Sequence, residues 1–149
     1  MVLGINPAVN TPALFDYARR KDVVWFEDRQ CVSENLSLVT AAVESFLAPL
    51  DSLYLTICLD AFPAAVAPGV SAPGVPGICP YTTLNLLDAI KQSCAANNTR
   101  LVLLDIAEMS PAFDRDHRTL GRTVGAALSA TAAMKPDSDN RNGRSRSRS

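Results

Sequence analysis

The stretch Ser-Leu-Tyr-Leu-Thr-Ile-Cys-Leu-Asp, residues 52–60, decides the fold class of this chain. Its nearly continuous apolar run is the strongest strand signal in the sequence, and it predicts a strand that is covered on both faces. A second apolar run at residues 100–106 predicts another buried strand. Each run ends near an acidic residue, so these two strands also bear on function.

The segments around these strands alternate short apolar runs with longer runs of helical spacing. Strands are expected at residues 2–5 and 23–26. Helices are expected from Pro12, from Ser33 to Pro49, over 82–95 and over 116–134. The order β-α-β-α-β-loop-α-β-α predicts parallel pairing with right-handed crossovers. The expected fold is therefore an α/β, three-layer α/β/α sandwich with a mostly parallel sheet.

The overall composition hides an uneven charge distribution. The 149 residues carry 14 basic and 15 acidic side chains and are 48% hydrophobic, which excludes a wholly disordered chain and a dedicated nucleic-acid binder. Residues 135–149 hold five basic and two acidic residues, and they predict a disordered basic Arg/Ser tail. RNA binding by the tail is the alternative, disfavoured because the run is short.

No targeting or membrane segment is expected. Residues 1–10 lack the pattern of a secretory signal, and five prolines interrupt the uncharged run at 61–87. The four cysteines have no C-x-x-C spacing, so scattered reduced thiols are expected rather than a structural zinc site. A cytoplasmic location and no membrane partner follow as expectations.

Candidate functional residues follow the two central strands. Ligands bind at the carboxyl ends of strands in open parallel sheets. Cys58 and Asp60 end one strand, and Glu108 follows the other. The alternative is that Asp60 only binds local backbone amides at a loop start, and that Glu108 is only a loop residue.

Three stretches resemble a known family. Residues 54–60, the Pro/Gly loop Ala-Pro-Gly-Val-Ser-Ala-Pro at 67–73 with Gly77, and Leu-Asp-Ile-Ala-Glu-Met-Ser-Pro-Ala-Phe-Asp at 104–114 look like the ureohydrolase signatures. That family includes arginases, agmatinases and formimidoylglutamases, and the loop is most similar to the formimidoylglutamase branch. The resemblance spans about residues 1–134.

This resemblance implies an arginase-like fold and hydrolysis of a small-molecule linear amidine. The reaction would convert N-formimidoyl-glutamate to glutamate and formamide in histidine degradation, with two Mn²⁺ ions, often in a homo-oligomer. By position, Asp60 would be a metal ligand and Glu108 would contact the substrate amidine. Cys58 stands where the family has an aspartate, and a soft thiolate suits manganese poorly.

The remaining ligands of the family's site have no counterpart here. The family takes them from an earlier histidine and an Asp-x-His-x-Asp segment, whereas the single histidine, His117, lies at the expected start of the last helix. Residues 1–134 are therefore interpreted as the carboxyl-terminal part of a ureohydrolase domain, with an incomplete fold and no turnover on its own. The alternative is a non-catalytic fragment or pseudoenzyme that acts as an interaction module. Uncovered apolar faces predict an unstable or aggregation-prone product.

Overall fold

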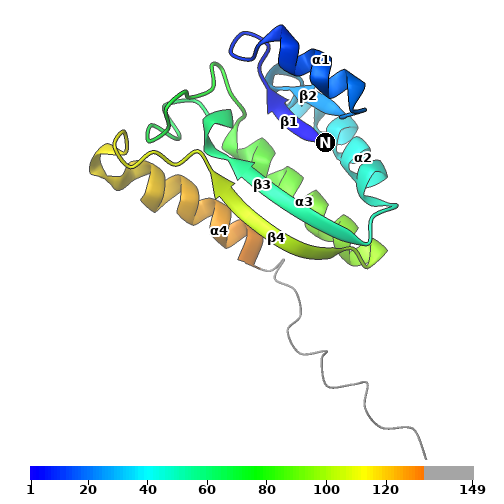
Figure 1. The fold of residues 1–149 in the computed structure, drawn as a ribbon. Coiled ribbons are helices and arrows are strands. Elements are labelled where there is room, and N and C mark those ends of the chain that lie inside the picture. Colours follow the sequence, from blue (N-terminus) through cyan, green and yellow to red (C-terminus); the bar gives the residue numbers. More distant parts are fainter. Residues whose placement is uncertain (133–149) are drawn as a thin grey trace, which may run out of the picture.

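The computed structural model describes residues 1–132 and places four strands and four α-helices in the predicted alternating order (Figure 1). The elements are β1 (Val2–Ile5), α1 (Pro12–Arg20), β2 (Trp25–Glu27), α2 (Leu36–Leu47), β3 (Ser52–Cys58), α3 (Pro80–Asn97), β4 (Arg100–Ala107) and α4 (Gly125–Thr131). The predicted α/β class is confirmed.

The strands form two separate parallel pairs within residues 1–132. β1 pairs with β2, and β3 pairs with β4. The longer pair runs from Ser52 opposite Arg100 to Cys58 opposite Ala107. Parallel pairing is confirmed, and it brings the carboxyl ends of β3 and β4 to the same edge of the sheet.

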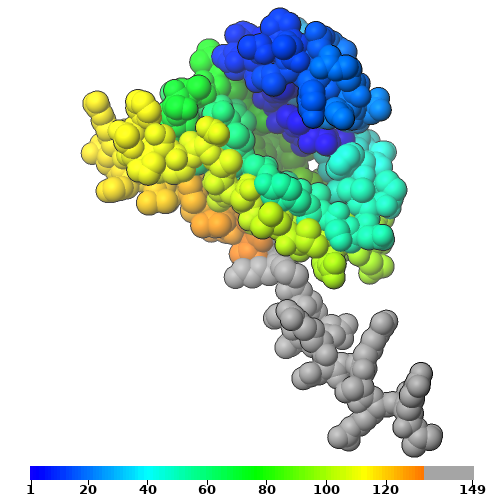
Figure 2. All heavy atoms as spheres, in the orientation of Figure 1, coloured from blue at the N-terminus to red at the C-terminus, as the bar shows by residue number. Residues whose placement is uncertain are grey.

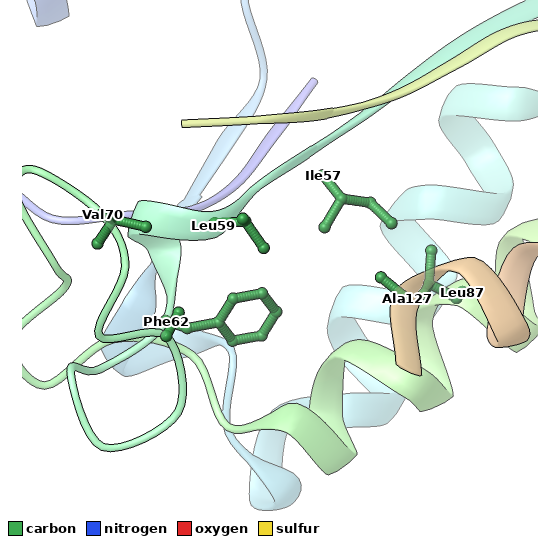
Figure 3. Close-up of a cluster of buried hydrophobic side chains, with 7 residues drawn as sticks. Ile57, Leu59, Phe62, Val70, Leu87 and Ala127 are labelled. Atoms are coloured by element: carbon green, nitrogen blue, oxygen red, sulfur yellow. The ribbon is translucent and has the colours of Figure 1, made fainter. Parts of the chain in front are cut away.

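The core lies between the β3–β4 sheet and helices α2, α3 and α4. Two clusters of buried side chains fill it, one toward the amino ends of β3 and β4 and one toward their carboxyl ends. Figure 3 shows Ile57, Leu59 and Phe62 of the second cluster facing Leu87 and Ala127. The first cluster comprises Val43, Leu47, Leu53, Ile90, Cys94 and Leu101.

The opposite face of the β3–β4 sheet is exposed. Tyr54 and Leu103 lie opposite each other in the pairing, and they are 55% and 53% exposed. No element of the described part packs over them. The prediction that the strand at 52–59 is covered on both faces is therefore wrong for residues 1–132, because the helices that follow β2, β3 and β4 all pack on the Leu53–Ile57 side.

The β1–β2 pair carries its own helix. Pro12 occupies the first turn of α1, where its missing N–H costs nothing. Phe15 of α1 packs edge-on against Trp25 of β2 with ring centroids 5.8 Å apart, and the Arg19 guanidinium lies over the same indole at 5.8 Å. These contacts fix α1 against β2.

The last helix begins later than predicted. Asp116 and His117 have φ values of 62° and 54°, in the left-handed region that a helix does not use. The side chain of Asp114 instead accepts hydrogen bonds from the backbone N–H groups of Thr119 and Leu120 at 2.8 and 3.1 Å. A π-helical segment at Thr119–Val124 then leads into α4.

The predicted Arg/Ser tail at 135–149 and the end of the 116–134 helix lie outside the described residues. Within residues 1–132, the structure holds no helix with the length and hydropathy needed to cross a bilayer.

Candidate functional site

The candidate site lies at the carboxyl ends of β3 and β4. Cys58 closes β3 opposite Ala107 of β4, Asp60 lies in the short 3₁₀ turn Leu59–Ala61, and Glu108 follows Ala107 directly. The parallel pairing thus brings together the three residues singled out in the sequence. The Cys58 thiol donates a hydrogen bond to the Asp60 carboxylate.

Cys58 is held in its neutral form. Burial raises the pKa of its thiol to about 12, with further contributions from a hydrogen bond to the Asp60 side chain and from the charges of Asp60 and Glu108. The thiol is therefore protonated at neutral pH. The Asp60 and Glu108 carboxylates therefore both lie close enough to the Cys58 sulfur to raise its pKa.

Glu108 occupies a strained position. Its φ of 69° lies in the left-handed region, which is uncommon for a residue with a Cβ. Its side chain is exposed at the end of β4. Non-glycine residues in this conformation gather at ligand sites, where the surrounding structure maintains them.

The Pro/Gly loop after β3 is tied to the turn after β4. The Gly69 N–H donates to the Thr119 hydroxyl at 2.6 Å, and the Gly69 carbonyl accepts from the Ser110 N–H at 2.8 Å. A Cβ on Gly69 would lie 2.6 Å from the Asp114 Cβ. Only glycine fits this close approach, so the two quoted motifs form one unit.

A second link binds the same loop to the β1–β2 pair. Asp28 follows β2, is only 5% exposed, and accepts from the Asn6 side-chain amide at 2.7 Å and from the Gly77 N–H at 3.3 Å. The Asn6 amide also donates to the Val75 carbonyl at 2.7 Å. Neither Asn6 nor Asp28 is among the site residues predicted from the sequence. The signal that could have found them is that each follows a strand, as Asp60 does.

Asp105 is a further polar residue that sequence analysis did not single out as a candidate. Its Oδ2 accepts a hydrogen bond of 2.5 Å from the Tyr54 hydroxyl across the β3–β4 pair. Its Oδ1 is buried without a hydrogen-bond partner among the described residues. A buried orphan oxygen on the exposed sheet face costs stability unless another donor reaches it.

The residues of this chain do not by themselves fit a two-manganese centre. Across the described range there is no group of three or more His, Cys, Asp or Glu side chains arranged to hold a metal ion. Asp60 and Glu108 are hard carboxylate donors, but Cys58 is a neutral, soft thiol. His117 lies in the turn before α4, outside the three-residue cluster of Cys58, Asp60 and Glu108.

Comparison with known proteins agrees with this architecture. The sequence model of the arginase family matches residues 1–134. The formimidoylglutamase of Rhodococcus opacus is 46% identical over 118 residues, which is 79% of this chain and 35% of that protein. That of Hahella chejuensis is 41% identical over 132 residues, or 89% of this chain and 39% of that protein.

Solved structures show the same fold. The formimidoylglutamase of Bacillus subtilis superposes with a TM-score of 0.75 at 21% identity, covering 89% of this chain and 40% of that one. The arginase of Helicobacter pylori superposes with a TM-score of 0.73 at 16% identity, covering 90% and 42%. The chain thus spans little more than a third of the length of its curated relatives.

Proposed function

This chain belongs to the arginase family, and from that premise we propose that it supplies one part of the active site of a formimidoylglutamase-like hydrolase. The similarity to formimidoylglutamases at 41–46% identity supports the choice of branch. The proposed reaction hydrolyses N-formimidoyl-glutamate to glutamate and formamide. We further propose that residues 1–134 correspond to the carboxyl-terminal part of the domain.

One observation carries this proposal: Cys58, Asp60 and Glu108 meet at the carboxyl ends of two paired parallel strands. An amidine is protonated at neutral pH, and a carboxylate binds it through charge-assisted hydrogen bonds. Glu108 is exposed and strained at this edge, which suits a residue that contacts substrate. We assign substrate binding to Glu108 and a place in the ligand shell of a hard metal ion to Asp60.

The chemistry of the reaction defines what the site must provide. A water oxygen bonds to the amidinium carbon, and the bond from that carbon to the glutamate nitrogen breaks. Both water protons end on that nitrogen, which leaves as the ammonium group of glutamate while formamide forms. A bound Glu108 carboxylate orients the amidinium during this exchange. Family membership is consistent with a binuclear manganese site, and in the family the metal pair would supply an activated hydroxide.

The described residues provide too few ligands for that metal pair. We therefore expect this chain to be inactive alone and to need the remainder of an arginase domain. Formamide release would be measured for the chain alone and for a combination of two polypeptides. The combination is this chain co-expressed with the part of Rhodococcus opacus formimidoylglutamase that lies outside the 118 residues aligned with this chain. We expect release only from the combination, and release by the chain alone would contradict the shared site.

A matched pair of variants tests the role of Glu108. Glu108→Gln removes the charge that binds the amidinium, so we expect kcat/KM of the combination to fall at least about tenfold, mainly through KM. Glu44→Gln changes another exposed glutamate, on α2, and it should leave kcat/KM within about twofold. Equal effects of the two variants would contradict the assignment of Glu108.

A non-catalytic interaction module is the second candidate function. The neutral Cys58 thiol favours it, because a protonated thiol replaces the charged ligand that the family carries there. A combination that assembles but releases no formamide, even with added Mn²⁺, would identify this case. The expected homo-oligomer and cytoplasmic location stay predictions.

A further inference from the structure

The α3–α4 pocket, with a volume of about 260 Å³, lies between the loop after β3 and the helices α3 and α4. Ile57, Phe62, Leu87 and Ala127 form its floor, and all four are buried. Figure 3 shows these four side chains arranged around a common space. The volume lies just below the range of about 300–1,000 Å³ that is usual for ligand sites, so the pocket suits a small molecule.

This pocket is separate from the hollow beside β1. Figure 2 shows that hollow between the blue β1 region and the cyan-green β3 segment. The linings of the hollow and of the α3–α4 pocket have no residue in common. Cys58, Asp60 and Glu108 do not line the α3–α4 pocket either. A ligand bound in this pocket would therefore occupy a site apart from the proposed hydrolytic site.

The pocket has a single charged residue. Among the twelve described residues that line it, Arg122 alone carries a charge. Arg122 is exposed, and no carboxylate of residues 1–132 forms a salt bridge with it. The two hydroxyls of the lining already donate to backbone carbonyls, Thr123 to Val66 at 2.6 Å and Thr83 to Cys79 at 3.3 Å. The free donors are thus the N–H groups of the Arg122 guanidinium, which suit a carboxylate.

The wall that carries this arginine has an unusual backbone. Arg122 and Thr123 belong to the π-helical segment Thr119–Val124. Such turns are rare in proteins, and they are frequent at functional sites. Asp114 holds the start of the segment by accepting hydrogen bonds from the N–H groups of Thr119 and Leu120. The hydrogen bond from Thr123 to Val66 then fixes the segment against the loop after β3.

We propose that the α3–α4 pocket binds a small monocarboxylate with an apolar tail, its tail on the buried floor and its carboxylate on Arg122. A sugar or a peptide would meet a floor without hydrogen-bond partners, and an amine would be repelled by the arginine. The volume accommodates roughly eight or nine groups of the size of a water molecule, which is close to the size of hexanoate. The proposal does not depend on the hydrolysis proposed above.

The test titrates the full ¹⁵N-labelled chain with hexanoate, at protein concentrations low enough to limit association. We expect saturable binding of one hexanoate per chain, with shifts of the Thr83, Thr123 and Ala126 amide resonances. Hexan-1-ol has the same tail without the charge and should bind at least about fivefold more weakly. Butanoate should also bind at least about fivefold more weakly, because it buries two methylenes fewer. Binding that does not saturate, equal affinities for hexanoate and hexan-1-ol, or shifts confined to β1 and β3 would overturn the proposal.

Three arginine variants test the charge. Arg122→Gln should lower the affinity for hexanoate at least about fivefold and leave that for hexan-1-ol within about twofold. Arg122→Lys keeps the charge and should bind hexanoate within about threefold of wild type. Arg118→Gln changes another exposed arginine that does not line the pocket, and it should leave both affinities within about twofold. Equal losses in Arg122→Gln and Arg118→Gln would overturn the assignment of Arg122.

Two phenylalanine variants test the location. Ala126 is an exposed residue of α4 that lines the pocket, so Ala126→Phe should obstruct it and weaken both hexanoate and hexan-1-ol at least about fivefold. Ser129→Phe adds the same ring at an exposed position of α4 outside the pocket, and it should change neither affinity by more than about twofold. Equal effects of the two variants would place the binding elsewhere and overturn the proposal. Formamide release enters none of these measurements, so failure of the proposed hydrolysis would leave their outcome unchanged.

Discussion

The Gly69 N–H donates a hydrogen bond of 2.6 Å to the hydroxyl of Thr119, a side chain with no exposed surface. This contact joins the loop after β3 to the segment after β4. The Ser110 N–H reinforces the junction by donating to the Gly69 carbonyl at 2.8 Å. Asp60 and Glu108 lie at the starts of these two segments, so the junction holds the segments that carry both carboxylates.

Gly69→Ala should destabilise the chain by about 1–3 kcal/mol, the usual cost of overpacking. The added Cβ would lie 2.6 Å from the Asp114 Cβ and 2.8 Å from the Thr119 hydroxyl oxygen, and the Asp114 backbone also lies close by. The free energy of unfolding would be measured by pulse proteolysis in urea, at concentrations low enough to limit association of the exposed apolar faces.

Gly121→Ala is the matched control for this change. Gly121 has nothing within 4 Å of its added Cβ and lies in the helical segment Thr119–Val124. Alanine there should stabilise the chain by about 0.4–1 kcal/mol, because it reduces the freedom of the unfolded chain. If Gly69→Ala behaved like Gly121→Ala, the two loops would not be packed as described.

Asp114 should make stability depend on acid pH. Burial opposes its ionisation, but hydrogen bonds from the N–H groups of Thr119 and Leu120 and from the Thr119 hydroxyl outweigh burial and lower its pKa. A lowered pKa means that the stabilisation is present above the unfolded pKa of about 3.9 and is lost as pH falls further. Asp114→Asn should therefore be less stable than wild type at pH 7.

The gap in stability between wild type and Asp114→Asn should close as pH falls below about 4. Urea midpoints at pH 7, 5 and 3 would measure this closing. Asp88→Asn changes an exposed residue of α3, and its urea midpoint should vary with pH in the same way as that of wild type. A gap that stays constant down to pH 3 would show that Asp114 does not act through its charge.

Much of the fold is predictable because its signals are local. The apolar runs at 52–59 and 100–106 predict β3 and β4, and the intervening helix predicts their parallel pairing. That pairing alone brings Asp60 and Glu108 to one edge. The separation into two strand pairs is not predictable in this way, because strand neighbours depend on contacts distant in the chain.

The features that the sequence did not predict also depend on particular side-chain contacts and not on local patterns. Asp116 fits a helix start by sequence, yet Asp114 caps the N–H groups of Thr119 and Leu120 and leaves Asp116 in a left-handed turn. The Asn6–Asp28 contact spans 22 residues and has no motif spacing. Such contacts become visible only once the strand ends are placed together.

Cys58 should react slowly with thiol reagents although it is only half-buried. Its pKa of about 12 leaves little thiolate at pH 8, so iodoacetamide should alkylate it at least about a hundredfold more slowly than the exposed Cys79. Peptide mass spectrometry would follow both sites in one sample. Comparable rates at the two cysteines would contradict the raised pKa.

Asp60→Asn should increase the reactivity of Cys58. The variant removes a negative charge and a carboxylate acceptor that both favour the protonated thiol, so its pKa should fall. Asp51→Asn, an exposed change before β3, should leave the alkylation rate of Cys58 unaltered. An unchanged alkylation rate of Cys58 in Asp60→Asn would show that Asp60 does not raise the pKa of the thiol.

Cys58→Asp should convert this strand end into a better manganese ligand. The variant sets a second carboxylate two residues from Asp60, and Mn²⁺ prefers carboxylate oxygen to sulfur. The wild-type thiol must also lose its proton before it binds a metal, which its high pKa opposes. Mn²⁺ affinity would be measured by calorimetry on the chain co-expressed with the unaligned part of Rhodococcus opacus formimidoylglutamase. We expect this affinity to rise at least about tenfold.

Cys58→Ser separates charge from size in this experiment. Serine is close to cysteine in volume but carries no charge, so Cys58→Ser should bind Mn²⁺ no more tightly than wild type. Zn²⁺, which accepts thiolate ligands, should lose affinity in Cys58→Ser. Equal Mn²⁺ affinities of the aspartate and serine variants would mean that the edge formed by residues 58 and 60 does not face the metal, and Asp60 would then have to be removed from the proposed ligand shell.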